Sequence, residues 1–400
     1  MTSSPNKKIR LPAAVIALGF TSLFTDLGAE MIYPLLPAFV ASLGAGPIFL
    51  GLVEGLADAT ASLLKLASGF AADKTRHKKS WVLFGYGLAA LVRPLVAFAT
   101  APWHVLFVRV TDRIGKGLRS SPRDALIAAV VVEESAGRAF GFHQAMDHAG
   151  AVIGPLLATA LLSLGLPMRV VFFVSIIPGA LSVLSALPVK EPAKEPAPVS
   201  QPAAATTRLQ PAAVLPRSLQ VYLLILVVFS LGSSSDVFLL LRAKELGIPV
   251  ASIALLWAAF HVVKLISSYV GGNWSDRIAR TKVIVAGWLI YAATYLGFGL
   301  ARESWHIWAL FAVYGLFYGL TEPVEKALVR DLAPAEIRGR AYGWYNSIIG
   351  FTAVPAGLIT GWLWQQLGPL VALATGAGLA LAASIALIAW EYARPKQTST

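Results

Sequence analysis

The 400-residue chain contains no cysteine, which excludes disulfide bonds and metal sites built from thiolates. Charged residues are also scarce, at 14% of the sequence, whereas hydrophobic residues make up 56%. Soluble domains carry about 25% charged residues, so this composition excludes an ordinary soluble globular protein. A formal net charge of +12 would favour a nucleic-acid partner in a soluble protein. Here the basic residues gather in short loops between apolar runs, which indicates orientation in a lipid bilayer and no nucleic-acid partner.

Long apolar runs divide the chain, and a bilayer core needs roughly 20 residues of helix. Breaks at proline, glycine and charged residues predict about twelve transmembrane helices in an all-α integral membrane protein. The expected spans are 11–33, 47–72, 80–100, 103–130, 139–165, 168–187, 218–241, 249–272, 282–301, 304–329, 340–366 and 369–391. The first is expected to be a retained helix, because its apolar stretch is too long for a signal peptide and no small-residue cleavage site follows it.

The middle of the chain differs in composition from the rest. Residues 188–217 are rich in proline, alanine, glutamine and threonine. Such a segment cannot bury enough apolar surface to offset the entropy lost on ordering. We therefore expect a flexible cytoplasmic linker between two six-helix bundles, residues 1–187 and 218–400.

Lysine and arginine are distributed unequally between the two sides of the expected bundles. Loops after even-numbered spans hold most of them. The other loops hold only Arg169, Arg242, Lys244 and Arg302. The positive-inside rule predicts a multi-pass protein of the cell (cytoplasmic) membrane with both termini in the cytoplasm. Tyr33, Trp103 and Trp305 are expected at the outer ends of spans, where amphipathic rings favour the headgroup region.

Two short patterns each occur twice, about half a chain apart. The first is a glycine, an aspartate four residues later and then a basic residue. Its copies are Gly69, Asp73 and Lys74, and Gly272, Asp276 and Arg277. The second is a Gly-Arg-Ala sequence that opens the fifth span at residue 137 and the eleventh at residue 339. Patterns repeated once per half indicate a duplicated helical transporter.

These features resemble the major facilitator superfamily, whose motif A matches both copies of the first pattern. The first copy departs from the family in having Thr75-Arg76 where Gly-Arg is typical. The resemblance implies two pseudo-symmetric six-helix bundles that rock around a central site by alternating access. It also implies that Asp73 faces the start of the eleventh span and Asp276 the start of the fifth, where a helix dipole favours negative charge. Such contacts would latch the cytoplasmic side in an outward-open state.

The fifth span resembles motif C of the drug:proton antiporters in the same superfamily. The matching residues are Gly141, Gly150, Gly154 and Pro155, and the last two glycines of the motif are replaced by Ala158 and Thr159. Small residues let helices approach closely, and proline permits a bend. The alternative is ordinary glycine-rich packing between membrane helices. By resemblance, the motif favours export.

Ionisable residues within membrane spans are costly and are therefore candidates for function. Asp26, Glu30, Glu54 and Asp58 are the candidates for proton coupling, because a partly desolvated carboxylate can take up and release a proton. The alternative is a static salt bridge to the basic stripe of the fourth span, which also carries Arg119 and Arg123. Candidates for substrate binding are Arg109, Asp112, Arg113, Lys116, His143, Asp147, Asp236, Lys264 and Glu322. The duplicated register places Arg123-Asp124 opposite Glu325-Lys326, which suggests either ion pairs between the bundles or compensation within each helix neighbourhood.

Three functions fit this pattern, and all are transport driven by an ion gradient. The first is proton-coupled efflux of small organic compounds. The second is transport of organic or phosphorylated anions, since the fourth span supplies guanidinium groups suited to them. The third is export of divalent metals through Asp26, Glu30, His143, Asp147 and His148, although no tight ligand spacing is visible. No phosphate-binding loop, enzymatic activity or cofactor is expected. The expected partners are a small-molecule substrate, protons and the lipid bilayer, and the protein is expected to be a monomer.

Overall fold

The computed structural model describes residues 11–74, 77–131, 133–191, 215–275, 278–334 and 337–393. Within these ranges every regular element is a helix, which confirms the all-α class. The first half contains α1 (Ala13–Ile32), η1 (Tyr33–Leu35), α2 (Leu36–Ser42), α3 (Pro47–Lys74), α4 (Lys78–Val92), η2 (Arg93–Phe98), α5 (Pro102–Val130), α6 (Glu133–Ser163), α7 (Met168–Val174) and α8 (Ile176–Ala186). The second half contains α9 (Arg217–Gly232), α10 (Val237–Glu245), α11 (Val250–Ser275), α12 (Arg280–Leu300), α13 (Ser304–Leu332), α14 (Arg338–Leu367) and α15 (Pro369–Ala393).

Eleven segments of the described chain are long and apolar enough to cross a membrane. The helix outside this set is α5, which has the required length at 29 residues but carries too many charges. It packs against α3 and α4, and Arg109, Asp112 and Arg119 of its charged face are buried. Together these segments give the twelve spans that were expected from the sequence.

The first and seventh spans differ from the expected ones. The first span does not end at Tyr33 but continues through η1 and α2 to Ser42. Pro34 and Pro37 lie in the first turns of η1 and α2, where a missing N–H costs no hydrogen bond. The seventh span is interrupted after Gly232, and its chain resumes as a helix at Val237. Most of the expected linker, residues 188–217, lies outside the described residues.

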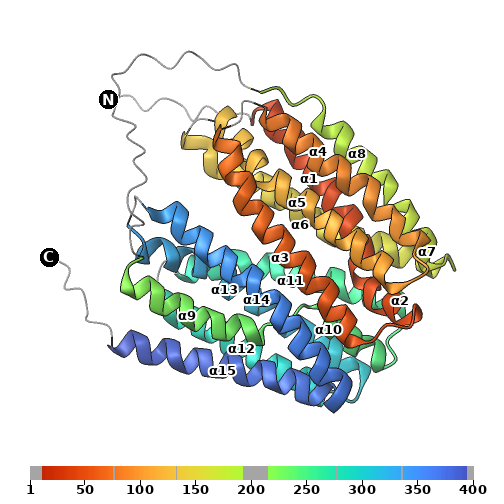
Figure 1. Cartoon of the computed structure of the whole chain (residues 1–400), viewed down its shortest axis with the longest axis vertical. Helices are drawn as coiled ribbons and strands as arrows, with labels where there is room; N and C mark the ends of the chain where they lie inside the picture. The colour runs from red at the N-terminus through yellow and green to blue at the C-terminus, as the bar shows by residue number, and fades with distance from the viewer. Residues whose placement is uncertain are drawn as a thin grey trace.

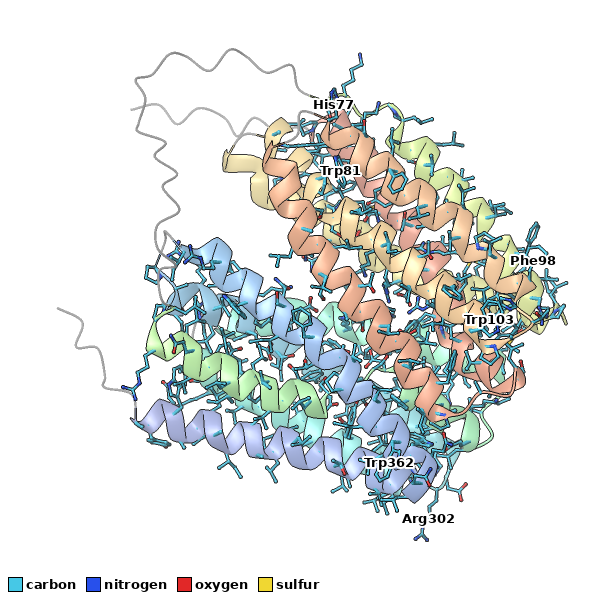
Figure 2. The ribbon with its side chains drawn as sticks, viewed as in Figure 1. His77, Trp81, Phe98, Trp103, Arg302 and Trp362 are labelled. Atoms are coloured by element: carbon cyan, nitrogen blue, oxygen red, sulfur yellow. The ribbon has the colours of Figure 1, made fainter. Side chains whose placement is uncertain are left out.

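The halves of the molecule lie side by side, with α1–α8 in one bundle and α9–α15 in the other (Figure 1). We call the end of the bundles at which residues 11 and 393 lie the proximal end, and the opposite end the distal end. The halves pack together through α3 with α14 and through α6 with α11. They converge at the distal end, where α10 contacts η1, α2 and α3, and they diverge toward the proximal end. Trp103 and Trp305 are exposed near the distal starts of α5 and α13, and Figure 2 shows Trp103 there.

Four turns at the distal end occupy corresponding positions in the two halves of the chain. Gly44, Gly165, Gly247 and Gly368 each follow a leucine at the end of a helix and have positive φ angles of 79–89°. The first and third are 203 residues apart, and so are the second and fourth. At Gly165 the N–H bonds the carbonyl of Leu162, and the next N–H bonds that of Leu161, which is the Schellman arrangement. Gly44 and Gly247 form the same arrangement, whereas the N–H of Gly368, which precedes a proline, bonds the carbonyl of Trp364.

Replacing Gly165 with alanine is expected to lower the free energy of unfolding by about 1–2 kcal/mol, because an L residue is strained in the left-handed region. Thermal and denaturant unfolding of the purified protein measures this change. Gly378→Ala is the matched control, since Gly378 lies within α15 with open space around its Cα and ordinary helical φ. That control should be neutral or stabilising. Equal effects at both positions would contradict the explanation.

Candidate functional site

A cavity of about 470 Å³ lies between the two halves. Its walls are built from η1, α3 and α5 of the first half and from α9, the break between α9 and α10, α13 and α14 of the second. The charged side chains that line it are Glu54, Asp58, Arg113, Lys116, Asp236, Glu322, Glu325 and Lys326. Of the residues expected to bind substrate, the structure brings Arg113, Lys116, Asp236 and Glu322 to this cavity. Its size is within the range of small-molecule sites.

Two buried ion pairs anchor the basic face of α5 behind the cavity wall. Arg109 donates to both oxygens of Glu54, with Nε–Oε1 at 3.0 Å and Nη2–Oε2 at 2.7 Å. Asp112 accepts from Nε of Arg93 at 2.8 Å. Arg93 was not among the expected site residues, although a lone arginine inside an apolar run was a usable signal. These pairs neutralise α5 locally and hold it against α3 and the end of α4.

The next turn of α5 faces the cavity with weaker pairing. Arg113 lies 3.9 Å from Asp58, whose side chain is 49% exposed. Lys116 forms no ion pair within 4.0 Å with any residue in the described ranges. The first half therefore presents two cations to the cavity and one loosely held carboxylate.

Further along α5, the expected pairing between the bundles is absent from the described residues. Arg123 binds its neighbour Asp124, with Nη2–Oδ1 at 2.9 Å. Glu325, on the other half, bonds Trp288 and Tyr345 of its own bundle. In this conformation Arg123 and Glu325 each take their partners from their own half, and Arg123 alone is paired with an opposite charge.

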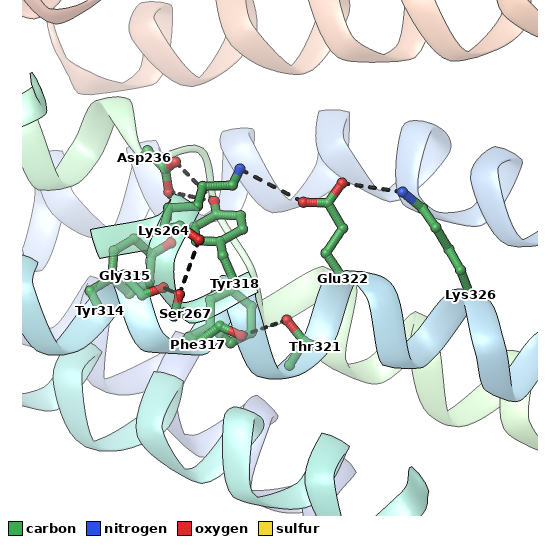
Figure 3. Close-up of polar contacts among 10 residues, drawn as sticks. All are labelled: Asp236, Lys264, Ser267, Tyr314, Gly315, Phe317, Tyr318, Thr321, Glu322 and Lys326. Atoms are coloured by element: carbon green, nitrogen blue, oxygen red, sulfur yellow. Dashed lines mark hydrogen bonds and ion pairs between the residues drawn. The ribbon is translucent and has the colours of Figure 1, made fainter. Parts of the chain in front are cut away.

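The second half holds a connected polar network around Asp236 (Figure 3). Asp236 ends the interruption between α9 and α10, so its carboxylate projects beside α13. It accepts hydrogen bonds from the hydroxyls of Tyr314 at 2.6 Å and Tyr318 at 2.9 Å. Lys264 of α11 places its Nζ 4.0 Å from the centre of the Tyr318 ring and 3.7 Å from Glu322. Glu322 also pairs with Lys326 one turn later on α13, at 3.2 Å.

Glu325 is a cavity residue that was not among the expected site residues. The residue is 6% exposed, and its carboxylate accepts from Nε1 of Trp288 at 3.0 Å and from the hydroxyl of Tyr345 at 2.8 Å. Neither donor is charged, and no lysine or arginine of the described chain lies within 4.0 Å of it. An acidic residue within the expected span 304–329 was a signal that could have identified it as a candidate.

Asp26 and Glu30 of α1 lie outside the cavity lining. Glu30 accepts a hydrogen bond from Nε1 of Trp257 at 2.8 Å and lies 3.9 Å from His261, so it joins α1 to α11. Tyr33 continues this contact between the halves, with its hydroxyl 3.2 Å from Ser235 Oγ. The expectation that Tyr33 sits in the headgroup region was therefore wrong, because the first span extends two more turns beyond it.

His143 and Asp147 share one face of α6, with Nδ1 and Oδ2 3.6 Å apart. Neither residue lines the cavity. Among the described residues, no group of three or more histidine, aspartate or glutamate side chains is placed to hold a metal ion. The five side chains considered for a metal site are thus not brought together in this conformation.

The glycines of the expected motif C pack α6 against α1. A Cβ at Gly150 would meet the carbonyl oxygen of Leu23, and one at Gly154 would meet that of Leu27. Gly141 has open space instead, and Pro155 lies within the continuous helix α6. Two of the three glycines therefore allow close helix approach, as the pattern indicates.

The motif A residues lie at the proximal ends of α3 and α11. Gly69 and Gly272 are helical. The side chains of Asp73 and Lys74 lie outside the described part of the structure, as do Asp276 and Arg277 entirely. The expected contacts of these aspartates with the fifth and eleventh spans stay predictions.

Comparison with known proteins extends these observations. The family model of the Major Facilitator Superfamily matches residues 18–242 and 221–400. An uncharacterized MFS-type transporter of Methanocaldococcus jannaschii is 31% identical over 385 residues, covering 94% of each chain. The multidrug resistance protein MdtH of Yersinia pestis is 26% identical over 337 residues, covering 81% of this chain and 80% of MdtH.

Solved structures show the same fold. A POT family transporter in complex with 5-aminolevulinic acid superimposes with a TM-score of 0.78 at 12% identity, covering 96% of both chains. A bacterial homolog of the lysosomal transporter Spinster, in an inward-facing and unoccupied conformation, gives a TM-score of 0.73 at 15% identity, also with 96% of both chains covered. With a duplicated twelve-span fold, a cavity between its halves and a family match over nearly its whole length, the chain belongs to the major facilitator superfamily and is a multi-pass membrane transporter, not an enzyme.

Proposed function

We propose that the chain is an alternating-access, proton-coupled exporter of small organic compounds, acting as a monomer in the cell membrane with both termini in the cytoplasm. The positive-inside distribution of lysine and arginine supports this orientation. The motif C glycines and the similarity to a protein named for multidrug resistance support export. In this orientation the conformation described is closed outside, where α10 meets η1 and α2, and its halves diverge toward the cytoplasm.

The observation that carries proton coupling is the environment of Glu325. Its carboxyl group lines the cavity and is held only by the neutral donors of Trp288 and Tyr345. Protonating Glu325 does not deprive any cation of its counter-charge. Protonating Glu54, in contrast, would leave the buried guanidinium of Arg109 without one. Glu54 was also a candidate for proton coupling, but its ion pair with Arg109 favours a structural role. Asp58, another candidate, is accessible from the cavity.

Coupling follows from the position of Glu325, which shares the cavity with two other carboxylates. Uptake of one proton there removes one negative charge close to Glu322 and Asp236, which line the same space. A bound cationic group loses attraction when that happens, so protonation favours its release. Since the cavity opens to one side at a time, loading a proton outside and releasing it inside would drive the compound outward.

Replacing Glu325 with glutamine tests this mechanism. The amide has nearly the same shape but cannot carry a proton through the cycle. We expect substrate-induced proton flux to fall at least tenfold in proteoliposomes that contain a pH-sensitive dye, while exchange of labelled compound across the bilayer persists. Glu391→Gln, on the exposed end of α15, is the matched control and should behave like the unmodified protein. Undiminished proton flux in Glu325→Gln would rule out this carboxyl as the coupling group.

A second candidate function is transport of organic or phosphorylated anions, and the position of Lys116 favours it. This side chain lines the cavity and has no ion-pair partner within 4.0 Å among the described residues. If anions are the cargo, Lys116→Gln should abolish anion uptake while leaving the movement of lipophilic cations unchanged. The same proteoliposomes, loaded in turn with each class, separate the two candidates.

A further inference from the structure

The two walls of the cavity carry opposite excess charge. On the first half, Arg113 and Lys116 face the cavity with Asp58 as the only acidic group not already held by a buried arginine. Glu54 also lines the space, but both of its oxygens are bonded to Arg109. The wall formed by α3 and α5 is therefore basic by one charge.

The facing wall is acidic. Asp236, just before α10, and Glu322 and Glu325 of α13 line the cavity together with Lys326. Lys264, behind Tyr318, is close enough to Glu322 to offset a second charge. Asp236 and Glu325 remain without a cation within 4.0 Å in the described chain and are held by tyrosine and tryptophan donors instead. The cavity is thus polarised from one half of the protein to the other.

We infer that the substrate is a small zwitterion whose anionic group binds at Arg113 and Lys116 and whose cationic group binds at Asp236. This inference rests on the proposed transport function and names its substrate class. A charge enters a low-dielectric cavity at high cost unless a partner compensates it. A zwitterion meets compensating charge on both walls and adds no net charge to the membrane interior. A single-charge compound satisfies one wall and leaves the other unpaired.

Lys264 shows how the acidic wall holds an ammonium group. Its Nζ lies over the face of the Tyr318 ring and beside Glu322, which is a cation–π contact combined with a carboxylate (Figure 3). Asp236 is fixed in place by two tyrosine hydroxyls, so its carboxylate is already oriented when a ligand arrives. The basic wall offers a guanidinium and an ammonium group, which suit a carboxylate or phosphate.

Binding of matched compounds to the purified protein tests this assignment. The probes are 6-aminohexanoate and 4-(aminomethyl)benzoate, each compared with its N-acetyl derivative, which lacks the cation, and its methyl ester, which lacks the anion. We expect each zwitterion to bind at least tenfold more tightly than both of its derivatives, measured by calorimetry and by the shift of the unfolding temperature. Equal affinity for the ester or for the acetylated compound overturns the inference, and so does failure of both zwitterions to bind.

Two variants test which wall of the cavity binds each charged group of the zwitterion. Lys116→Gln should weaken the zwitterion and the acetylated compound by the same factor while leaving the ester unaffected. Asp236→Asn should do the reverse, weakening the zwitterion and the ester only. Such selective losses are not produced by a folding defect, which would weaken every probe. Arg302→Gln, at an exposed distal position, is the control and should change none of the affinities. Uniform losses in both variants overturn the assignment.

Failure of this inference is distinguishable from failure of the proposed function. If lipophilic cations drive proton flux through Glu325 but the zwitterions do not bind, export stands and the substrate class is wrong. If the zwitterions bind as expected but never cross the bilayer, the site assignment stands and the transport proposal fails.

Discussion

Arg109→Met should lower the free energy of unfolding by about 3–5 kcal/mol, because it leaves the Glu54 carboxylate buried without its cation. The side chains of the two residues are only 7% and 2% exposed, and two hydrogen bonds join them across α3 and α5. With its side chain only 2% exposed, the Glu54 carboxylate has little access to water that could replace the lost partner. The loss should therefore be among the largest produced by a single substitution in this chain.

The measurement is denaturant and thermal unfolding in detergent, with a double variant as the decisive comparison. Glu54→Gln combined with Arg109→Met removes both charges and should recover a large part of the lost stability, since apolar replacement of a whole buried pair is often nearly neutral. Lys326→Met breaks the pair with Glu322, in which the side chains are 49% and 46% exposed, and serves as the control. Its ion-pair loss should be about 0–1 kcal/mol. Equal losses for Arg109→Met and Lys326→Met would show that the Glu54 pair is not buried as described.

Gly51→Val should move the distal ends of the two halves apart. Gly51 of α3 and Gly357 of α14 meet backbone to backbone, and a Cβ added at Gly357 would lie 2.5 Å from the carbonyl oxygen of Gly51. The reciprocal Cβ at Gly51 would clash with the backbone of Gly357. Backbone atoms cannot rotate away, so the helices must separate. At about 1–3 kcal/mol for such overpacking, the closed distal state should lose 5- to 150-fold in relative population.

Distance measurements between two spin labels test this shift. Ser42→Cys on α2 and Gln366→Cys on α14 are exposed distal positions on opposite halves, and the chain has no other cysteine to be labelled. Gly51→Val should add a population with longer distances between these labels. Gly378→Val, on a face of α15 with open space, is the matched control and should leave the distribution unchanged. An unaltered distribution in Gly51→Val would mean that the distal contact does not set the conformational equilibrium.

The number of spans and the duplication could be predicted from the sequence because both depend on local composition. Apolar length is a property of each segment alone, and a repeated pattern needs no knowledge of contacts. The end of the first span was misplaced because Pro34 and Pro37 look like breaks, whereas they occupy the first turns of new helices. Tyr33 was assigned to the headgroup region for the same reason.

The pairing of charges could be predicted only in part. The fourth span cannot expose its charged face to lipid, so partners on neighbouring helices were expected, and Glu54 is one of them. Which carboxylate meets which arginine depends on side-chain rotation and helix offset, and no sequence pattern encodes these. The duplicated register suggested a contact of Arg123 with Glu325, but Arg123 pairs with Asp124 instead. The pairing of Arg93 with Asp112 was not predicted.

The charged face of α5 also constrains how the protein is made. Seven of its residues are ionisable as Asp, Lys or Arg, and each such group at the centre of an isolated helix opposes insertion by about 2.5–3.5 kcal/mol. Emerging from the ribosome alone, α5 would not partition into lipid. Its insertion must wait until α3 and α4, which are synthesised first, offer Glu54 and the surface around Arg93. Membrane insertion of the first half is thus cooperative. The earlier helices supply the packing surface and counter-charges for a later helix that cannot enter the membrane by itself.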